Sequence, residues 1–394
     1  MKNLQNVFLS FVFTIIVFGI NFIVPSQING FHENGFNLNF NNLINTSYAE
    51  TIFNVRYDNP VFGRRPIILE SQKFLNEYLN VPFQFSFNLL NFVLLFCLFL
   101  ILSKCDFKTR KADPKILKFA FLFSIPILFA FFGSMCTYDD LGQYLFLLLF
   151  LIFLFKEKHL ISIFFFVLAC ITRETSFIFY IVIIPFLLFE AKTNKAIKII
   201  SWVLPIILYL GFLTLYLSNE HINESKDFLL NNRFYAWQSN FRDWNRFRES
   251  TTLLFIMLFP YLFLLRRKFL KETSSEMKMW CKIASVLIII NAMIIVTSGL
   301  ISEVRLLFIP LLFIIPFLQA ELKEISIILL SNLNRNIPWK SLILSGLIAF
   351  LWYQPKTQGT GYFYKIYVFI FLLIVFESIL YKSYDQIGIN DQMK

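Results

Sequence analysis

Long apolar blocks alternate with short polar connections along almost the whole chain. Most blocks are about 15 to 22 residues long, close to the roughly 20 residues that a helix needs to cross the hydrocarbon core of a bilayer. The pattern predicts an all-α integral membrane protein with about twelve transmembrane helices. The predicted spans are 7–24, 85–103, 116–133, 142–155, 160–172, 175–189, 197–217, 251–265, 282–299, 304–319, 341–353 and 365–381.

Basic residues gather in the short connections between the predicted spans and set the predicted orientation. The connections 104–118 and 266–282 are rich in Lys and Arg, which short cytoplasmic loops retain. We therefore predict that both termini are cytoplasmic and that the long loops 25–84 and 219–250 are external. No Pro/Gly/Ser-rich linker or internal repeat divides the chain, so residues 1–394 are predicted to form a single membrane domain.

Composition excludes a soluble globular protein. The chain is 57% apolar and only 15% charged, against about 25% charged residues in soluble domains. Its net charge of +11 is explained by the basic cytoplasmic connections, so no nucleic-acid partner is implied. The sequence has no P-loop, HExxH or GxSxG motif, which leaves ATP-driven transport, zinc proteolysis and serine hydrolysis without support.

Each long external loop contains a candidate surface helix. Pro66 opens a segment that ends before Pro82, and its apolar residues share one face of a helix: Ile67, Ile68, Phe74, Leu75, Tyr78 and Leu79. Such a segment predicts an amphipathic helix lying flat at the membrane surface. In the second loop, aromatic residues with helical spacing predict either another interfacial helix or a lid: Trp237, Phe241 and Trp244.

Acidic residues lie at the predicted external ends of spans, so we expect any chemistry on that face. Asp139 and Asp140 directly precede the span 142–155. One aspartate could cap the N-terminus of that helix. Two adjacent carboxylates exceed what a cap needs, and together they could ligate a divalent cation or act as a general base.

Charged residues also stand beside the shortest predicted spans. Each charge at membrane depth costs a few kcal/mol, so we expect Arg173 and Glu174 to have a structural or functional role that offsets this cost. Either they form an ion pair that closes a tight turn, or Arg173 lies in a polar cavity and binds phosphate through its planar fork. Glu303 and Arg305 begin a later span, where they either anchor the helix end or pair with other spans; Glu303 with Arg173 is one candidate pair.

The first external loop carries four further charged residues, Arg56, Asp58, Arg64 and Arg65. Two interpretations stay open for its arginines. They could extend toward anionic lipid headgroups, as long basic side chains do at membrane surfaces. They could instead form a basic cradle for a lipid-linked phosphate.

Taken in order, four stretches resemble the GT-C superfamily of polytopic glycosyltransferases, in particular a bacterial branch of it. Residues 59–91, which contain Phe62-Gly63-Arg64-Arg65-Pro66-Ile67-Ile68, are similar to that branch's Arg-Pro-Leu segment. Tyr138-Asp139-Asp140-Leu141 resembles the aspartate ahead of its fourth span, and Thr172-Arg173-Glu174-Thr175 its Arg-Glu-Thr turn. Glu303-Val304-Arg305 resembles the Glu-x-Arg start of a late span. The resemblance covers about residues 1–320.

The resemblance implies an enzyme of the bacterial cytoplasmic (inner) membrane. Such an enzyme transfers a sugar from a polyprenyl-phosphate donor to an envelope glycan, lipid or protein acceptor on the external face. The resemblance also implies two catalytic acids, for which the chain offers Asp139 or Asp140 and, in the first loop, Glu50 or Asp58. We assign the remaining roles as follows: phosphate binding to Arg64, Arg65, Arg173 and Arg305, support to Glu174 and Glu303, and a divalent cation to Asp139 and Asp140.

Other membrane functions compete with this hypothesis. A polysaccharide polymerase would use arginines of the loop 219–250. A transporter or flippase would favour ionisable residues near the bilayer midplane and two related halves, and the sequence shows neither pattern. A catalytically silent scaffold of envelope-glycan assembly is the remaining alternative.

Overall fold

The structure is a computed structural model, and every regular element among its described residues is a helix. It describes residues 2–23, 50, 53–54, 56–58, 65–104, 139–183, 195–216, 235–271, 273–299, 301, 305–317 and 339–352. The predicted spans 116–133 and 365–381 lie outside the described residues.

Within the described part, helices coincide with the predicted apolar blocks. The first group of them is α1 (Lys2–Ile23), α5 (Phe83–Lys104), α7 (Asp140–Phe155), α8 (His159–Thr172) and α10 (Lys195–Tyr216). Among the described residues, three helical segments are long and apolar enough to cross a membrane: Phe85–Leu102, Lys195–Leu215 and Met277–Ser298. These segments agree with the prediction of a helical, multi-pass membrane protein.

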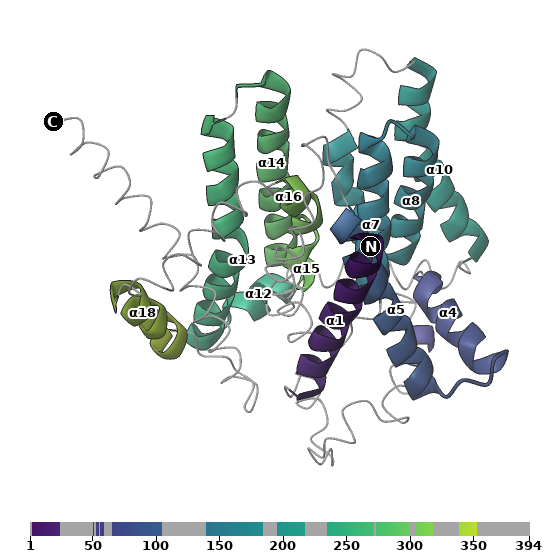
Figure 1. Cartoon of the computed structure of the whole chain (residues 1–394), viewed down its shortest axis with the longest axis horizontal. Coiled ribbons are helices and arrows are strands. Elements are labelled where there is room, and N and C mark those ends of the chain that lie inside the picture. The colour runs from purple at the N-terminus through teal and green to yellow at the C-terminus, as the bar shows by residue number, and fades with distance from the viewer. Residues whose placement is uncertain are drawn as a thin grey trace.

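The helices of the first group pack in a continuous series, α1 against α5, α5 against α7, α7 against α8 and α8 against α10 (Figure 1). A tight turn at 156–158 joins α7 to α8, so these two helices run in opposite directions. The N-terminus of α7 and the C-terminus of α8 therefore lie at the same end of the hairpin, which is the end that carries the charged residues predicted to be functional.

Glu157 in that turn has a positive φ of 59°, a conformation that costs residues other than glycine about 1 kcal/mol or more. We predict that Glu157→Gly raises the free energy of unfolding by about 0.5 kcal/mol, since the relief of strain exceeds the added entropy of the unfolded chain. Thermal unfolding of the purified protein in detergent checks this result. Glu157→Ala, which keeps the strain, should bring no gain.

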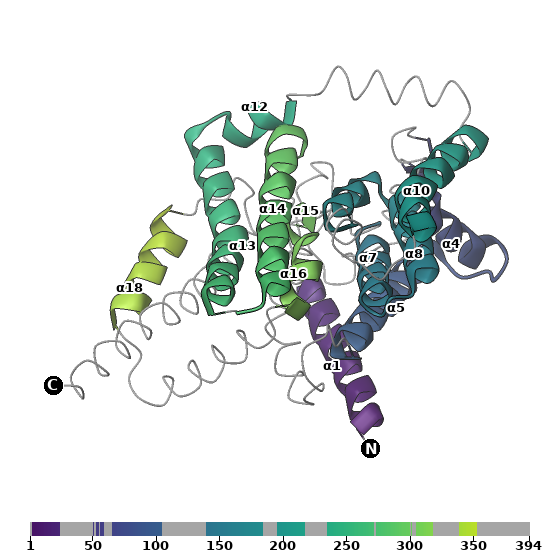
Figure 2. The same cartoon turned by 90° about the horizontal axis from the view of Figure 1, so that it is seen from above.

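The second group of helices forms the other half of the described structure. It comprises α12 (Tyr235–Phe241), α13 (Trp244–Lys271), α14 (Ser275–Ser298), α15 (Arg305–Phe308) and α16 (Leu311–Phe317), with α18 (Trp339–Gly346) and the π-helix η5 (Leu347–Trp352). Helices α13 and α14 lie side by side, and α12 lies across their ends (Figure 2). The Asn240 side chain fixes α12 there by donating to the carbonyl oxygens of Val296 and Gly299, at 3.2 and 2.9 Å.

Two predicted helices are interrupted in the structure. The predicted span 304–319 is divided into α15 and α16 at Pro310, which has no N–H to donate and whose carbonyl oxygen accepts from the first turn of α16. The aromatic segment of the second loop is divided between α12 and α13. The Asp243 carboxylate accepts from the Arg246 N–H at 2.9 Å and so caps the start of α13. The prediction of one continuous helix for 304–319 was therefore wrong, and in the aromatic segment the alternative of a single helix that contains Trp237, Phe241 and Trp244 does not hold.

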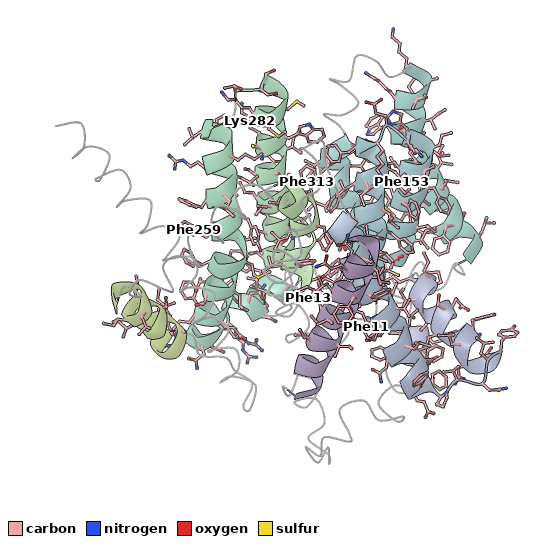
Figure 3. All side chains as sticks on the ribbon, in the orientation of Figure 1. Phe11, Phe13, Phe153, Phe259, Lys282 and Phe313 are labelled. Carbon is pink, nitrogen blue, oxygen red and sulfur yellow. The ribbon has the colours of Figure 1, made fainter. Side chains whose placement is uncertain are left out.

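One apolar core joins the two groups. Phe313 of α16 lies between them, with its ring 6.3 Å from that of Phe155 in α7 and 5.9 Å from that of Trp280 in α14 (Figure 3). Within the first group, Phe11 of α1 meets Phe92 of α5 edge to face at 5.8 Å. Aromatic side chains thus supply much of the packing between helices.

The predicted surface helix of the first loop is present as α4 (Pro66–Glu77), which begins at Pro66 as predicted. Its buried face differs from the prediction, because Ile68, Leu69 and Gln72 are covered by neighbouring helices whereas Phe74 and Tyr78 are exposed. Packing against α5 and α8 determines which side of α4 is covered. The exposed aromatic side chains remain available to the membrane interface.

Candidate functional site

A cluster of charged side chains lies at the end of the hairpin where α7 begins and α8 ends. It contains three arginines and three carboxylates, so its formal net charge is zero, and we call it the charge cluster: Arg56, Arg65, Asp139, Asp140, Arg173 and Glu174. Arg65 directly precedes α4, the aspartates stand at the start of α7, and Arg173 and Glu174 follow α8. Three segments far apart in the sequence therefore meet at this point.

Each carboxylate of the charge cluster contacts a guanidinium group. Nη1 of Arg56 lies 2.5 Å from Oδ2 of Asp139, and Nη1 of Arg65 lies 3.7 Å from the same oxygen. Arg65 donates from Nε and Nη2 to the two carboxylate oxygens of Glu174, at 2.9 and 2.5 Å. Arg173 donates from Nη1 to Oδ1 of Asp140. Arg65 thus bridges Asp139 and Glu174, and the pair of Arg173 with Asp140 is formed by the chain neighbours of these two acids.

The helix ends favour these charges where they stand. The N-terminus of a helix carries a partial positive charge and the C-terminus a partial negative charge. Asp140 is the first residue of α7, and Arg173 directly follows the last residue of α8. Each side chain therefore carries a charge opposite in sign to the partial charge at the end of its own helix, which is favourable. Because the hairpin places the two ends together, Asp140 and Arg173 also pair with each other.

Polar side chains behind the charge cluster hold the start of the 3₁₀-helix η4 (Glu174–Phe179) against α7. The Gln143 amide donates from Nε2 to the hydroxyl oxygens of Thr175 and Ser176, both at 2.9 Å. The Ser176 hydroxyl in turn donates to the carbonyl oxygen of Ala169 at 2.9 Å. Sequence reasoning missed Gln143. Its spacing of three residues from Asp140, which places both side chains on one face of α7, is the signal that could have found it.

A glycine allows the three segments to approach closely. A Cβ atom added to Gly142 would lie 2.7 Å from Cδ1 of Ile68 in α4 and 3.3 Å from Cγ2 of Thr172 in α8. Ile68 follows Arg65 by three residues, and Thr172 directly precedes Arg173. The absence of a side chain at position 142 thus leaves room for Ile68 and Thr172 to pack close to α7.

Burial makes the electrostatics of the charge cluster strong. Burial alone lowers the pKa of Arg65, but the negative charges of Glu174, Asp139 and Asp140 outweigh this effect and raise the pKa above its ordinary value. Arg65 is therefore a permanent cation. Buried polar atoms beside these pairs that have no hydrogen-bond partner among the described residues include Oδ1 of Asp139, Oε1 of Gln143 and Nε of Arg173.

Several charged side chains contact other partners in the structure than those predicted from the sequence. The Asp139 side chain makes no capping hydrogen bond, because its carboxylate faces arginines instead. Arg173 and Glu174 do not close the turn as a pair, since Arg173 contacts Asp140 and Glu174 contacts Arg65. Arg56 and Arg65 are buried with these acids rather than extended toward lipid headgroups.

The remaining predicted site residues are not part of the charge cluster as described. Glu50 and Asp58 are exposed, whereas the acids of the cluster at the start of α7 are buried, so these two predicted acids do not share the buried setting of Asp139 and Asp140. Arg64 and Glu303 lie outside the described residues, which leaves the predicted pair of Glu303 with Arg173 undescribed. The backbone of Arg305 begins α15, and its side chain is also outside the described part.

The donor set does not favour the predicted divalent cation at Asp139 and Asp140. Within the described ranges, no group of three or more His, Cys, Asp or Glu side chains is arranged to hold a metal ion. Both aspartates face guanidinium groups, which would repel a divalent cation. The mechanism proposed below therefore uses no metal.

Comparison of the chain with protein-family profiles, with characterised proteins and with solved structures finds no match. The chemistry of the charge cluster is therefore the guide to function. The buried arginines can bind an anion, and the buried carboxylates next to them can accept a proton.

Proposed function

We propose that the chain is a membrane glycosyltransferase of the GT-C type. It transfers a sugar from a polyprenyl-phosphate donor to an envelope glycan, lipid or protein acceptor on the external face of a bacterial cytoplasmic membrane. The observation that supports this proposal is the charge cluster, because it unites residues of three separate stretches on which the resemblance depends: Arg65, the Asp139-Asp140 pair and Arg173-Glu174.

The predicted orientation limits the kind of donor. With both termini in the cytoplasm, the start of α7 and the end of α8 face outward. Nucleotide sugars are cytoplasmic, so an enzyme with outward acids needs a donor that has already crossed the membrane. A sugar on a lipid phosphate meets this need, and its phosphate suits a site that is rich in arginine.

In the proposed reaction, the Asp140 carboxylate accepts the proton of the acceptor hydroxyl. The freed oxygen forms a bond to the anomeric carbon of the sugar as the bond from that carbon to the phosphate oxygen breaks. The electron pair of the broken bond leaves with the polyprenyl phosphate, whose negative charge Arg173 stabilises. Arg173 contacts Asp140 in the structure, so binding of the phosphate would draw the guanidinium away and increase the basicity of the carboxylate.

We predict that Asp140→Asn lowers the rate of sugar transfer in membrane vesicles by roughly a hundredfold, because an amide cannot accept the proton. The measurement is the transfer of radiolabelled sugar from a polyprenyl-phosphate donor. Asp243→Asn is a matched control, since Asp243 is exposed and asparagine caps a helix equally well. Transfer by Asp140→Asn at the parental rate, with normal insertion, would overturn the assigned role.

A catalytically silent scaffold is the second candidate, and one observation favours it. The three arginines and three acids of the charge cluster balance each other without any ligand, as a purely structural network would. If the chain is a scaffold, its folding stability depends on the charge cluster, but it transfers no sugar from any donor.

A further inference from the structure

Arg65 holds Glu174 in the geometry with which arginine binds phosphate. Nε and Nη2 of the guanidinium donate in parallel to the two carboxylate oxygens, at 2.9 and 2.5 Å. The same two parallel N–H groups match two oxygens of a phosphate group. A phosphate could therefore replace the carboxylate on Arg65 without a change in the orientation of the arginine.

Glu174 is the member of the charge cluster that lies nearest to solvent. Its side chain is 25% exposed, whereas those of Arg65 and Asp139 are 8% and 1% exposed. A half-buried carboxylate can move into water at lower cost than a fully buried one. A ligand that reaches Arg65 therefore meets Glu174 first and can displace it.

Arg65 would keep its position after Glu174 leaves. Its Nη1 lies 3.7 Å from Oδ2 of Asp139, and this second acid continues to orient the guanidinium. Without the Glu174 carboxylate the described cluster has three arginines and two acids, hence a formal charge of +1. An anion is then required to restore neutrality, and with Glu174 in place no such requirement exists.

We propose that Glu174 occupies a phosphate-binding site on Arg65 and exchanges with the ligand, which is a phosphate monoester or diester. The side chain acts as an internal competitor: it closes the site when no phosphate is bound and moves aside when one arrives. This inference deepens the proposed function, because the donor's phosphate would be the ligand, but phosphate binding can be tested without sugar transfer.

Two sources could supply that phosphate, a lipid headgroup or a free anion. Helix α4 begins next to Arg65, exposes Phe74 and Tyr78, and is joined by a short turn to α5, which contains the candidate span Phe85–Leu102. A lipid phosphate bound at Arg65 would therefore have apolar surface beside it for its chain. The experiment separates the two sources with different probes.

The test uses the full chain in lipid nanodiscs and compares the parent with Glu174→Gln. One probe is inorganic phosphate, measured by calorimetry, and the other is nanodiscs of phosphatidylcholine with or without phosphatidic acid, in which retention of the acidic lipid is measured. Removal of the internal competitor should lower the dissociation constant for phosphate about tenfold, since apparent affinity scales with the fraction of protein whose site is open. Addition of Arg65→Lys should abolish the gain, because lysine lacks the two parallel donors.

Glu249→Gln is the matched control. Glu249 is also a buried acid that contacts an arginine, Arg246 at 3.1 Å, but it lies in α13 and outside the charge cluster. Its substitution should leave phosphate affinity unchanged. Should Glu174→Gln unfold, Glu174→Ser offers a second neutral side chain, and melting temperatures identify any variant that has lost its fold.

The outcomes are distinct. A gain for inorganic phosphate alone supports the site and identifies a free phosphate as its ligand. A gain for phosphatidic acid, with or without a gain for inorganic phosphate, supports the site and identifies a lipid headgroup as its ligand. Equal affinity of folded parent and Glu174→Gln for both probes overturns the inference. A gain in phosphate binding without sugar transfer from any donor would support the site and refute the transferase, so the two failures remain distinguishable.

Discussion

Replacement of Arg173 by alanine will lower the free energy of unfolding by about 4 kcal/mol. The substitution removes the guanidinium that contacts the buried carboxylate of Asp140, and removal of one partner of a buried ion pair typically costs 3–5 kcal/mol. Burial strengthens the attraction between the two charges. After the substitution it also raises the free energy of the remaining Asp140 carboxylate, because water cannot solvate that charge. Chemical unfolding of the purified protein in mixed micelles measures the effect.

Two further variants make this prediction specific. Arg242→Ala, the same change at an exposed position of the break between α12 and α13, should alter stability by no more than about 0.5 kcal/mol. The double variant Arg173→Met with Asp140→Leu should recover most of the loss, because an apolar pair of similar volume needs no charge compensation. If Arg173→Ala proves as stable as the parent, the ion pair does not contribute as described.

Gly142→Leu will produce the second large effect, a loss of about 3 kcal/mol with disruption of the charge cluster. The new side chain must enter a space where even its Cβ would lie 2.7 Å from Ile68 and 3.3 Å from Thr172. Overpacking of a tight core forces neighbouring side chains and backbone to shift, at a typical cost of 1–3 kcal/mol. The shift would separate α4 and α8 from α7, and with them Arg65 and Arg173 from the aspartates.

The chain offers a graded series and a matched control for this prediction. Gly142→Ala should be nearly neutral, because only the flexible end of Ile68 must move and alanine favours the helix by about 1 kcal/mol. Gly211→Leu in α10 should cause no loss, since nothing lies within 4 Å of its Cβ position. Ile68→Ala should restore part of the stability of Gly142→Leu. Equal effects of leucine at 142 and 211 would contradict the close packing.

Stability and transfer measurements on the same variants separate the two proposed functions. In the double variant Arg173→Met with Asp140→Leu, we expect the fold to recover its stability, although the proposed base and the arginine that binds the phosphate have been removed. A glycosyltransferase would then be stable and inactive. A scaffold would retain its role in assembly, because its network is only structural.

The pattern of residue types along the chain was sufficient to predict where most of the described helices form. The apolar blocks predicted α5 and α14 to within a few residues at most ends, since a long helix in a membrane depends on local hydrophobicity and on its own backbone hydrogen bonds. Pro66 likewise predicted the start of α4, because proline suits the first turn of a helix. The proline at 310, inside a predicted span, was the local signal for the break between α15 and α16.

Only the tertiary structure decided which charged residues meet. An ion pair between the adjacent residues Arg173 and Glu174 was one of two alternatives predicted from the sequence. In the structure they face Asp140 and Arg65 instead, because the backbone at Arg173 is extended and directs consecutive side chains apart. The covered face of α4 was decided in the same way, by packing against α5 and α8 through Ile68 and Leu69. Residue types predict where helices form, whereas ion-pair partners depend on distances between helices that are remote in the chain, such as the close approach of α4 and α8 to α7 at Gly142.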